Sequence, residues 1–259
     1  MDFLHPLSGF LVGIMVGLTG VGGGSLMAPL MILMLGVAPA TAIGTDLWFA
    51  AITKMVGGAV HHTQGHADWK IVKRLAWGSV PAALVTIWFL ATTETHQVKN
   101  GLIVQLLGAI LVVTALVTLF HRRISSAATQ VDGEHIAYYR QLLPALTILA
   151  GAILGVVVTL TSIGAGALGA TMLVMLYPLR LTPQKVVGTD IVHAVPLTIV
   201  AGLGHLWMGN VDFMLLGSLL IGSIPGIIIG SKLTKRVNAS ALRWALAAML
   251  LFSGVRLLL

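Results

Sequence analysis

Long, uncharged, apolar stretches alternate with short polar segments along the chain. No charged residue occurs between Leu7 and Thr45 or between Leu142 and Leu179. No segment shows the alternation of apolar and polar positions that is typical of a strand. The other apolar stretches are each close to the about 20 residues with which a helix spans a bilayer, and they lie at about residues 75–92, 100–120, 186–206, 214–231 and 244–258. The pattern predicts an all-α, polytopic (multi-pass) membrane protein.

Composition and charge agree with this prediction. Hydrophobic residues make up 57% of the 259 positions and charged residues only 9%, whereas about a quarter of a soluble domain is charged. The net charge of +7 comes from basic residues between the apolar stretches, so it does not indicate a nucleic-acid partner. The chain has no cysteine, which excludes disulfides and thiolate chemistry. The first ten residues, MDFLHPLSGF, lack a basic region and a cleavage site, so they predict the start of a membrane segment rather than a signal peptide.

The chain contains an internal repeat. A shift of 144 residues aligns Gly20–Pro81 with Gly164–Pro225 without a gap, and 18 of the 62 positions are identical. The identities include the Gly-Thr-Asp triplets at 44–46 and 188–190 and the Gly-Ser-x-Pro motifs at 78–81 and 222–225. We therefore expect an N-terminal transmembrane repeat at 1–120, a polar cytoplasmic linker at 121–140 and a C-terminal transmembrane repeat at 141–259.

The distribution of basic residues favours repeats of inverted topology. If each glycine-rich segment crossed the membrane once, seven basic residues would lie on either side. If each were a re-entrant hairpin, one side would hold twelve basic residues, and the other only Lys99 and Arg256. Because basic loops concentrate on the cytoplasmic side, the second arrangement is favoured. Single broken crossings remain the alternative, since only charge counts decide between the two.

The glycine clusters fit the tips of such hairpins. A helix over residues 7–36 would be about 45 Å long, more than one crossing requires. Broken at the sequence GVGGGS (20–25), it gives two arms of about 12–13 residues, each too short to cross. The sequence TSIGAGALG (161–169) is the equivalent tip, expected to enter from the opposite face. Each repeat would then contain one hairpin and three transmembrane helices.

Two opposed hairpin tips predict a binding site for a small anion. The second arm of each hairpin begins just after the glycines, so its first N–H groups lack partners and face the membrane centre with the positive helix end. The alternative is that the glycines only permit close helix packing. The predicted substrate-binding residues are Thr19, Gly22, Gly23, Gly24, Ser25, Thr45, Ser162, Gly164, Gly166 and Thr189.

Four ionisable residues within apolar stretches are candidates for coupling or for the substrate pathway: Asp46, Lys54, Asp190 and His193. Asp190 and His193 are three residues apart on one helix face, where they could pair or relay a proton. As alternatives, the aspartates cap helix starts and Lys54 extends toward the inner surface. Asp68 and Asp212 are expected to be N-caps. No metal site or cofactor is predicted, because the histidines at 61–66 lack further ligands at suitable spacing.

These motifs together resemble the sulfite exporter TauE/SafE family of membrane permeases. The resemblance rests on the sequence GVGGGS at 20–25, on Ala42-Ile43-Gly44-Thr45 and on Gly65-x-x-Asp68-Trp69 followed by Gly78-Ser79-x-Pro81, each echoed in the second half. It covers nearly the whole chain. It implies a secondary transporter of the bacterial cytoplasmic membrane that exports small sulfur-containing anions such as sulfite or organosulfonates.

The resulting interpretation is a non-enzymatic transporter that works by alternating access. Its partners are a small anionic substrate, the lipid bilayer and, as a hypothesis, protons as the coupling ion through Asp46 or Asp190. The alternatives are an anion-selective channel and a transporter of small carboxylates. Monomer and homodimer both remain open.

Overall fold

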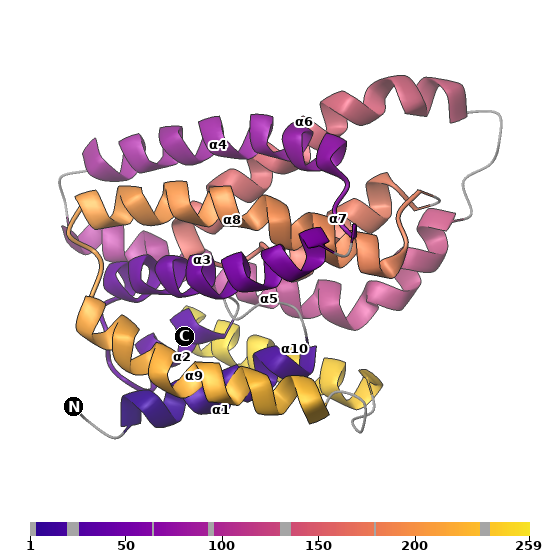
Figure 1. The fold of residues 1–259 in the computed structure, drawn as a ribbon. Coiled ribbons are helices and arrows are strands. Elements are labelled where there is room, and N and C mark those ends of the chain that lie inside the picture. Colours follow the sequence, from indigo (N-terminus) through magenta and orange to yellow (C-terminus); the bar gives the residue numbers. More distant parts are fainter. Residues whose placement is uncertain are drawn as a thin grey trace.

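The structure is a computed structural model, which describes residues 4–19, 26–63, 65–92, 96–129, 136–178, 180–233 and 239–259. These residues form helices and connecting loops, without strands, which confirms the all-α prediction for them (Figure 1). The helices are α1 (Leu4–Thr19), α2 (Met27–Leu33), α3 (Pro39–Thr63), α4 (Trp69–Thr92), α5 (His96–Thr129), α6 (Ile136–Thr161), α7 (Ala167–Leu176), α8 (Pro183–Trp207), α9 (Phe213–Leu233) and α10 (Ala239–Leu258).

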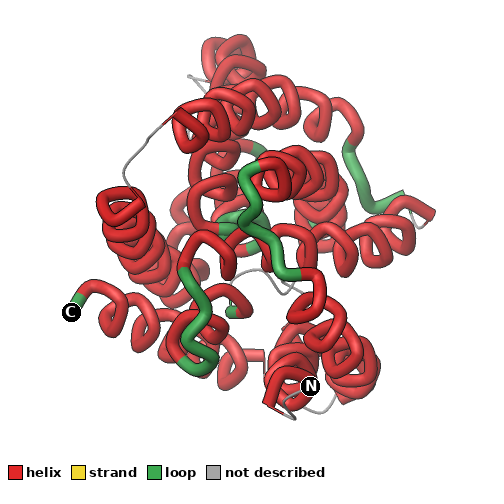
Figure 2. The backbone as a smooth tube through the Cα atoms, turned by 90° about the vertical axis from the view of Figure 1, so that its left-hand side faces the viewer, coloured by secondary structure: helices red, strands yellow, loops and turns green. Residues whose placement is uncertain are grey.

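The long helices lie side by side and form a bundle (Figure 1). In Figure 2 the bundle is turned so that most helices are seen close to end-on. Five apolar spans in the described part of the chain are long enough to cross a bilayer, at Trp69–Thr92, Ile103–Phe120, Gln141–Thr161, Pro183–Trp207 and Phe213–Gly230. The chain is therefore a multi-pass membrane protein. The predicted linker at 121–140 is partly helical, since α5 continues to Thr129 and α6 begins at Ile136.

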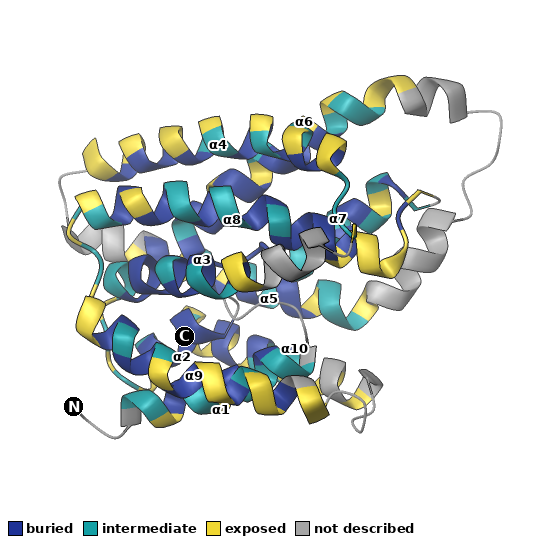
Figure 3. Cartoon of the chain, in the orientation of Figure 1, coloured by how far each residue is buried: buried dark blue, intermediate teal, exposed yellow. Residues whose placement is uncertain are grey.

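Helices α3 and α8 occupy the centre of the bundle (Figure 3). In the α8 span 61% of the residues are buried, against 33–44% in the other four spans. The outer spans present apolar side chains such as Trp77 and Ile221, which are 76% and 62% exposed. Exposed apolar side chains on the outer spans and buried polar ones on α3 and α8 are expected when lipid surrounds a bundle with a polar centre.

The two predicted halves interlock rather than fold side by side. Helix α1 packs most extensively against α9 of the other half, and α6 packs in the same way against α4. Glycines make both contacts close: Gly9 lies against the backbone of Leu219, and Gly151 lies against the backbone of Leu75. Leu75 and Leu219 occupy equivalent positions in the repeat. In both helix pairs, therefore, a glycine of one helix allows close packing at the same position of the other.

The central pair α3–α8 is also joined by reciprocal contacts. The hydroxyl of Thr45 accepts a hydrogen bond from the backbone N–H of Asp212 at 3.1 Å, and the hydroxyl of Thr189 accepts one from that of Asp68 at 3.0 Å. Each threonine lies near the start of its helix, and each aspartate lies just beyond the end of the opposite helix. Equivalent helices of the two halves therefore run antiparallel.

The predicted N-caps are confirmed. Asp68 Oδ1 accepts from the backbone N–H groups of Lys70 and Ile71 at 3.1 and 3.3 Å, at the start of α4. Asp212 Oδ1 accepts from the N–H of Leu215 at 2.9 Å, at the start of α9. The caps fix the loops to which Thr45 and Thr189 bind.

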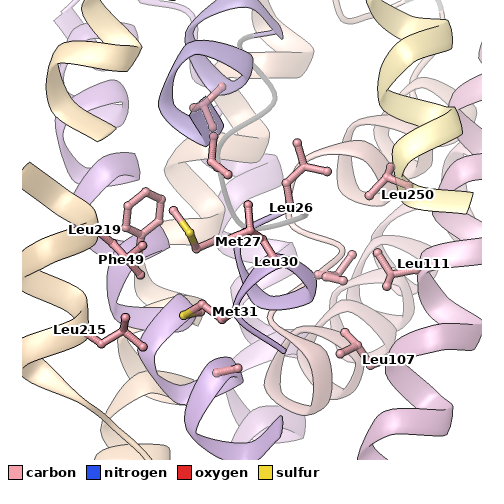
Figure 4. Packing of buried hydrophobic residues seen from close by; sticks show 14 of the residues in the cluster. Leu26, Met27, Leu30, Met31, Phe49, Leu107, Leu111, Leu215, Leu219 and Leu250 are labelled. Atoms are coloured by element: carbon pink, nitrogen blue, oxygen red, sulfur yellow. The ribbon is translucent and has the colours of Figure 1, made fainter. Parts of the chain in front are cut away.

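A large apolar cluster holds α2 in the bundle. Leu26, Met27, Leu30 and Met31 pack among side chains from α3, α5, α9 and α10 (Figure 4). Because α2 has only seven residues, this burial, rather than helix propensity, must stabilise it. The partners labelled in Figure 4 are Phe49, Leu107, Leu111, Leu215, Leu219 and Leu250.

Candidate functional site

The second glycine-rich segment is a tight, buried connection between α6 and α7. Gly164 and Gly166 have φ values of 121° and 139°, which side chains rarely tolerate, so glycine is needed there. Thr161 stabilises the connection, since its hydroxyl donates to the Val157 carbonyl at 2.7 Å and accepts from the Ile163 N–H at 3.2 Å. We refer to residues 162–166 as the α6–α7 tip. Both Ser162 and Ala165 in it are buried.

The two arms of this segment lie antiparallel. The hydroxyl of Tyr177, directly after α7, is 2.7 Å from that of Thr147, which lies fourteen residues before the end of α6. A single broken crossing would place these residues far apart, so the α6–α7 segment is a hairpin. Its arms differ from expectation in length: α7 has 10 residues, but α6 has 26. The apolar part of α6 alone, Gln141–Thr161, has 21 residues and is long enough to cross a bilayer, so the expectation of a first arm too short to cross is wrong for this segment. The helix also extends outward from there into the polar linker.

Lys54 connects the other half of the chain to the α6–α7 tip. Its ammonium donates a hydrogen bond to the carbonyl oxygen of Ala165 at 2.6 Å. Lys54 is 3% exposed and lies on α3 between the two reciprocal contacts of the α3–α8 pair, at Thr45 and Asp68. It does not extend toward a surface, so the alternative of an outward-directed lysine is wrong.

Of the four predicted ionisable residues, the other three come together around Lys54. Its ammonium interacts electrostatically with Asp46, Asp190 and His193. Asp46 and His193 are fully buried, and Asp190 is 3% exposed. One cation thus lies between two carboxylates that are equivalent in the repeat. In the second half the position equivalent to Lys54 is Thr198, so the lysine has no counterpart.

Each carboxylate also faces the first turn of a short helix. Asp190 Oδ1 lies against Gly169, in the first turn of α7, where any side chain would collide with it. Asp46 faces the backbone N–H of Ala28, in the first turn of α2, and the hydroxyl of Ser162. Neither group has hydrogen-bond geometry to Asp46, however. The carboxylates therefore lie where two helix N-termini carry partial positive charge.

Several polar atoms at this centre have no hydrogen-bond partner among the described residues. They are both oxygens of Asp46, Oδ1 of Asp190, Oγ of Ser162 and Nδ1 of His193. Unsatisfied buried polar atoms are costly and rare in proteins. A group of them on one site indicates that a proton or a ligand completes it.

His193 forms its hydrogen bond with α4 rather than with Asp190. The Nε2 atom of His193 is 2.9 Å from Oγ of Ser79, and both residues are fully buried. The spacing of Asp190 and His193 correctly placed them near one another, but sequence reasoning missed Ser79. Its presence in the repeated Gly-Ser-x-Pro motif was the available signal.

The remaining predicted substrate-binding residues either bind backbone groups elsewhere or lie outside what the structure describes. Thr45 and Thr189 bind backbone N–H groups across the α3–α8 pair, as described above, which gives their hydroxyls a structural role. Thr19 ends α1, but its side chain is outside the described part. Gly22, Gly23, Gly24 and Ser25 also lie outside the described residues. Within the part of the chain that the structure describes, no three histidine or acidic side chains are grouped as a metal site requires.

Comparison with known proteins identifies the family. The sequence profile of the sulfite exporter TauE/SafE family matches residues 6–257, almost the whole chain. The chain belongs to the TauE/SafE family. The family resemblance of the motifs is thereby confirmed, and the chain is a membrane transporter by family.

Curated TauE/SafE relatives carry transporter names without a substrate. The chain is 41% identical to the probable membrane transporter protein YjnA of Bacillus subtilis over 97% of its own length and 98% of that protein. It is 26% identical to YdhB of the same bacterium, also a probable membrane transporter protein, over 96% and 97% of the two chains. A probable membrane transporter protein of Methanocaldococcus jannaschii is 26% identical over 97% and 93%. No solved structure matches the chain.

Proposed function

We propose that this protein is an inverted-repeat secondary transporter that exports a small sulfur-containing anion, of the sulfite or organosulfonate class, by alternating access. The observation that carries the proposal is the hydrogen bond from Lys54, at the centre of the α3–α8 pair, to Ala165 of the α6–α7 tip. A buried cation there adjoins a helix N-terminus and a free hydroxyl. These are the groups with which proteins bind small oxoanions.

Two observations support the inverted topology. The equivalent helices α3 and α8 are antiparallel, and their contacts are reciprocal under the repeat. The α6–α7 segment turns back on itself as a hairpin, which the inverted arrangement of the repeats requires. With that arrangement twelve basic residues share one side, which we assign to the cytoplasm of a bacterial cell. The two transmembrane repeats, at 1–120 and 141–259, would then alternate access by rocking about α3 and α8.

The α6–α7 tip provides the anion ligands. Gly164 and Gly166 bring the backbone N–H groups at the start of α7 within reach of a ligand, and Ser162 offers a buried hydroxyl without a partner. Lys54 supplies the positive charge. From the repeat we also assign the glycines and the hydroxyl residue of the first glycine-rich segment, Gly22–Gly24 and Ser25, to the binding site.

Coupling to protons is assigned to the two aspartates. Asp46 and Asp190 are buried beside one lysine, so full ionisation of all three groups leaves a net negative charge in a medium of low dielectric constant. Protonation of one carboxylate removes that charge. An anion would therefore cross the membrane together with a change in protonation at the same site.

Counterflow in proteoliposomes tests the proposal. Vesicles with wild-type protein and a high internal sulfite or organosulfonate concentration should accumulate the labelled compound from outside, with saturable kinetics. Gly166→Leu should abolish this uptake, because its φ of 139° and its burial exclude a side chain. Gly36→Leu is the matched control, since Gly36 also has positive φ, at 64°, but nothing lies within 4 Å of the added atom. Unitary currents without counterflow would identify a channel, and no flux of any of these anions would contradict the proposed substrate class.

A further inference from the structure

The N-terminal turn of α7 is already in contact with a negative group of the protein itself. Asp190 Oδ1 lies against Gly169, the third residue of this ten-residue helix. The Gly169 N–H donates to the Gly164 carbonyl at 2.9 Å, whereas the N–H groups of the two preceding helical residues have no partner within the helix. A substrate anion bound to α7 would have to share this turn with the Asp190 carboxylate.

Asp190 does not act as an ordinary helix cap. A cap oxygen accepts a hydrogen bond from the first turn, but Asp190 Oδ1 has no partner among the described residues although the side chain is 97% buried. The hydroxyl of Ser162, in the same tip, is equally buried and equally without a partner. An acceptor and a hydroxyl left unsatisfied beside one helix N-terminus point to a group that is added to this place.

We propose that Asp190 and the substrate anion compete for the N-terminal turn of α7, so that the anion binds only when Asp190 is protonated. This inference rests on the proposed function and specifies how anion binding is coupled to protonation at the same site. Each monovalent anion is bound together with one proton. The two then move in the same direction, and transport of a monovalent anion carries no net charge.

The charged groups around Asp190 favour replacement of its negative charge by that of the anion. From α3 it is faced by Lys54. The same lysine also interacts with Asp46 of α3 and with His193 of α8, whose Nε2 atom bonds to Ser79. Helix α7 contains no charged residue, α6 only Arg140 near its outer end, and the charged residues of α4 all lie in its first two turns.

Lys54 interacts with both Asp190 and Asp46 and can neutralise only one of them. With all three groups ionised, one negative charge is in excess, and protonation of Asp190 removes it without disturbing Asp46. In the proposed competition Asp190 is the carboxylate that gives up its charge. Replacing its charge with that of an anion keeps the buried net charge constant. Binding an anion beside ionised Asp190 would add a second uncompensated charge in a medium of low dielectric constant.

Binding of methanesulfonate as a function of pH tests the competition. The charge of this probe is constant between about pH 5 and about pH 9 because sulfonic acids are strong acids, so any change in affinity reports on the protein. For wild type we expect the affinity to fall by up to about tenfold per pH unit above the titration of Asp190. Asp190→Asn, which is neutral at every pH, should bind with constant affinity. Asp212→Asn makes the same change at an N-cap, where asparagine can also accept the hydrogen bond from the Leu215 N–H, and it should behave like wild type.

A second measurement counts the protons taken up on binding. In weakly buffered solution wild type should take up one proton for each methanesulfonate bound, at a pH where Asp190 is ionised in the free protein, and Asp190→Asn should take up none. Binding without proton uptake, or a pH dependence that persists in Asp190→Asn, would overturn the competition while leaving the anion site intact. Failure of wild type to bind methanesulfonate or sulfite at any pH would instead contradict the proposed function.

Discussion

The ammonium of Lys54 donates a hydrogen bond to the carbonyl oxygen of Ala165, across 111 positions of sequence. This bond joins the central helix of the first half to the hairpin tip of the second. It also holds the one lysine of the site between two equivalent aspartates. Any rearrangement that moves the α6–α7 tip relative to α3 must break it or carry Lys54 along, which makes Lys54 a link between ligand binding and movement of the halves.

Lys54→Met should destabilise the protein. The substitution leaves two buried carboxylates without their cation, and removing one partner of a buried pair costs about 3–5 kcal/mol in the free energy of unfolding. Thermal unfolding in detergent measures the change, with Lys70→Met as the control because Lys70 is exposed. Adding Asp190→Asn to Lys54→Met should restore part of the loss. Equal stability of Lys54→Met and wild type would show that the carboxylates do not depend on the lysine.

Thr45→Val and Thr189→Val should each reduce stability by about 1–3 kcal/mol, because each leaves the backbone N–H of an aspartate without its acceptor. The two losses should be similar, since the contacts are reciprocal. They should also add in the double variant, because the sites lie at opposite ends of the α3–α8 pair. Unfolding gives the stabilities, and methanesulfonate binding gives the affinity. A large loss of affinity at unchanged stability would show instead that these hydroxyls bind substrate.

The sequence predicts the fold class and four of the five spans of the described residues, because an apolar stretch of about 20 residues indicates a membrane-spanning helix. The fifth span, Gln141–Thr161, was interpreted as a hairpin arm too short to cross. The repeat also predicted which residues are equivalent, and Thr45 and Thr189 do occupy equivalent places. What each equivalent residue contacts was not predictable. The partner of each threonine is a backbone N–H in the opposite half, and no side-chain pattern marks such an atom.

The sequence likewise predicted which residues belong to the site but not what each of them contacts. Asp46, Lys54, Asp190 and His193 stood out because charges within apolar stretches are expensive. Their convergence on one point depends on how α3 crosses α8. That crossing cannot be predicted from the spacing of residues along either helix. The acceptor of the Lys54 hydrogen bond is a main-chain carbonyl, and the contact at Gly169 depends on the absence of a side chain.

Gly9→Ala should destabilise the bundle, although alanine is the better helix former. The added methyl group would overlap the backbone of Leu219 and force α1 away from α9, at a cost of about 1–3 kcal/mol in unfolding free energy. Gly217→Ala, in α9, is the matched control, because nothing lies within 4 Å of its added methyl group. It should be neutral or stabilising by up to about 1 kcal/mol. Equal unfolding temperatures for the two variants would contradict the close α1–α9 contact.

Asp68→Ala and Asp212→Ala should differ in their dependence on salt. Both remove an N-cap, which costs about 1 kcal/mol of unfolding free energy. Only Asp68 also pairs with a cation, since its Oδ2 accepts a hydrogen bond from Arg180 at 2.6 Å. The Arg180 side chain is 47% exposed, so the pair adds at most about 1 kcal/mol, and salt screens it.

Unfolding temperatures at about 0.05 M and about 0.5 M NaCl measure this difference, since the screening length falls severalfold between them. The excess loss of Asp68→Ala over Asp212→Ala should shrink at high salt, and Arg180→Gln should reproduce that excess alone. Because Arg180 joins the loop after α7 to the loop before α4, the pair fixes the outer end of the hairpin. An excess that is unchanged by salt would mean that packing, and not the ion pair, holds the hairpin there.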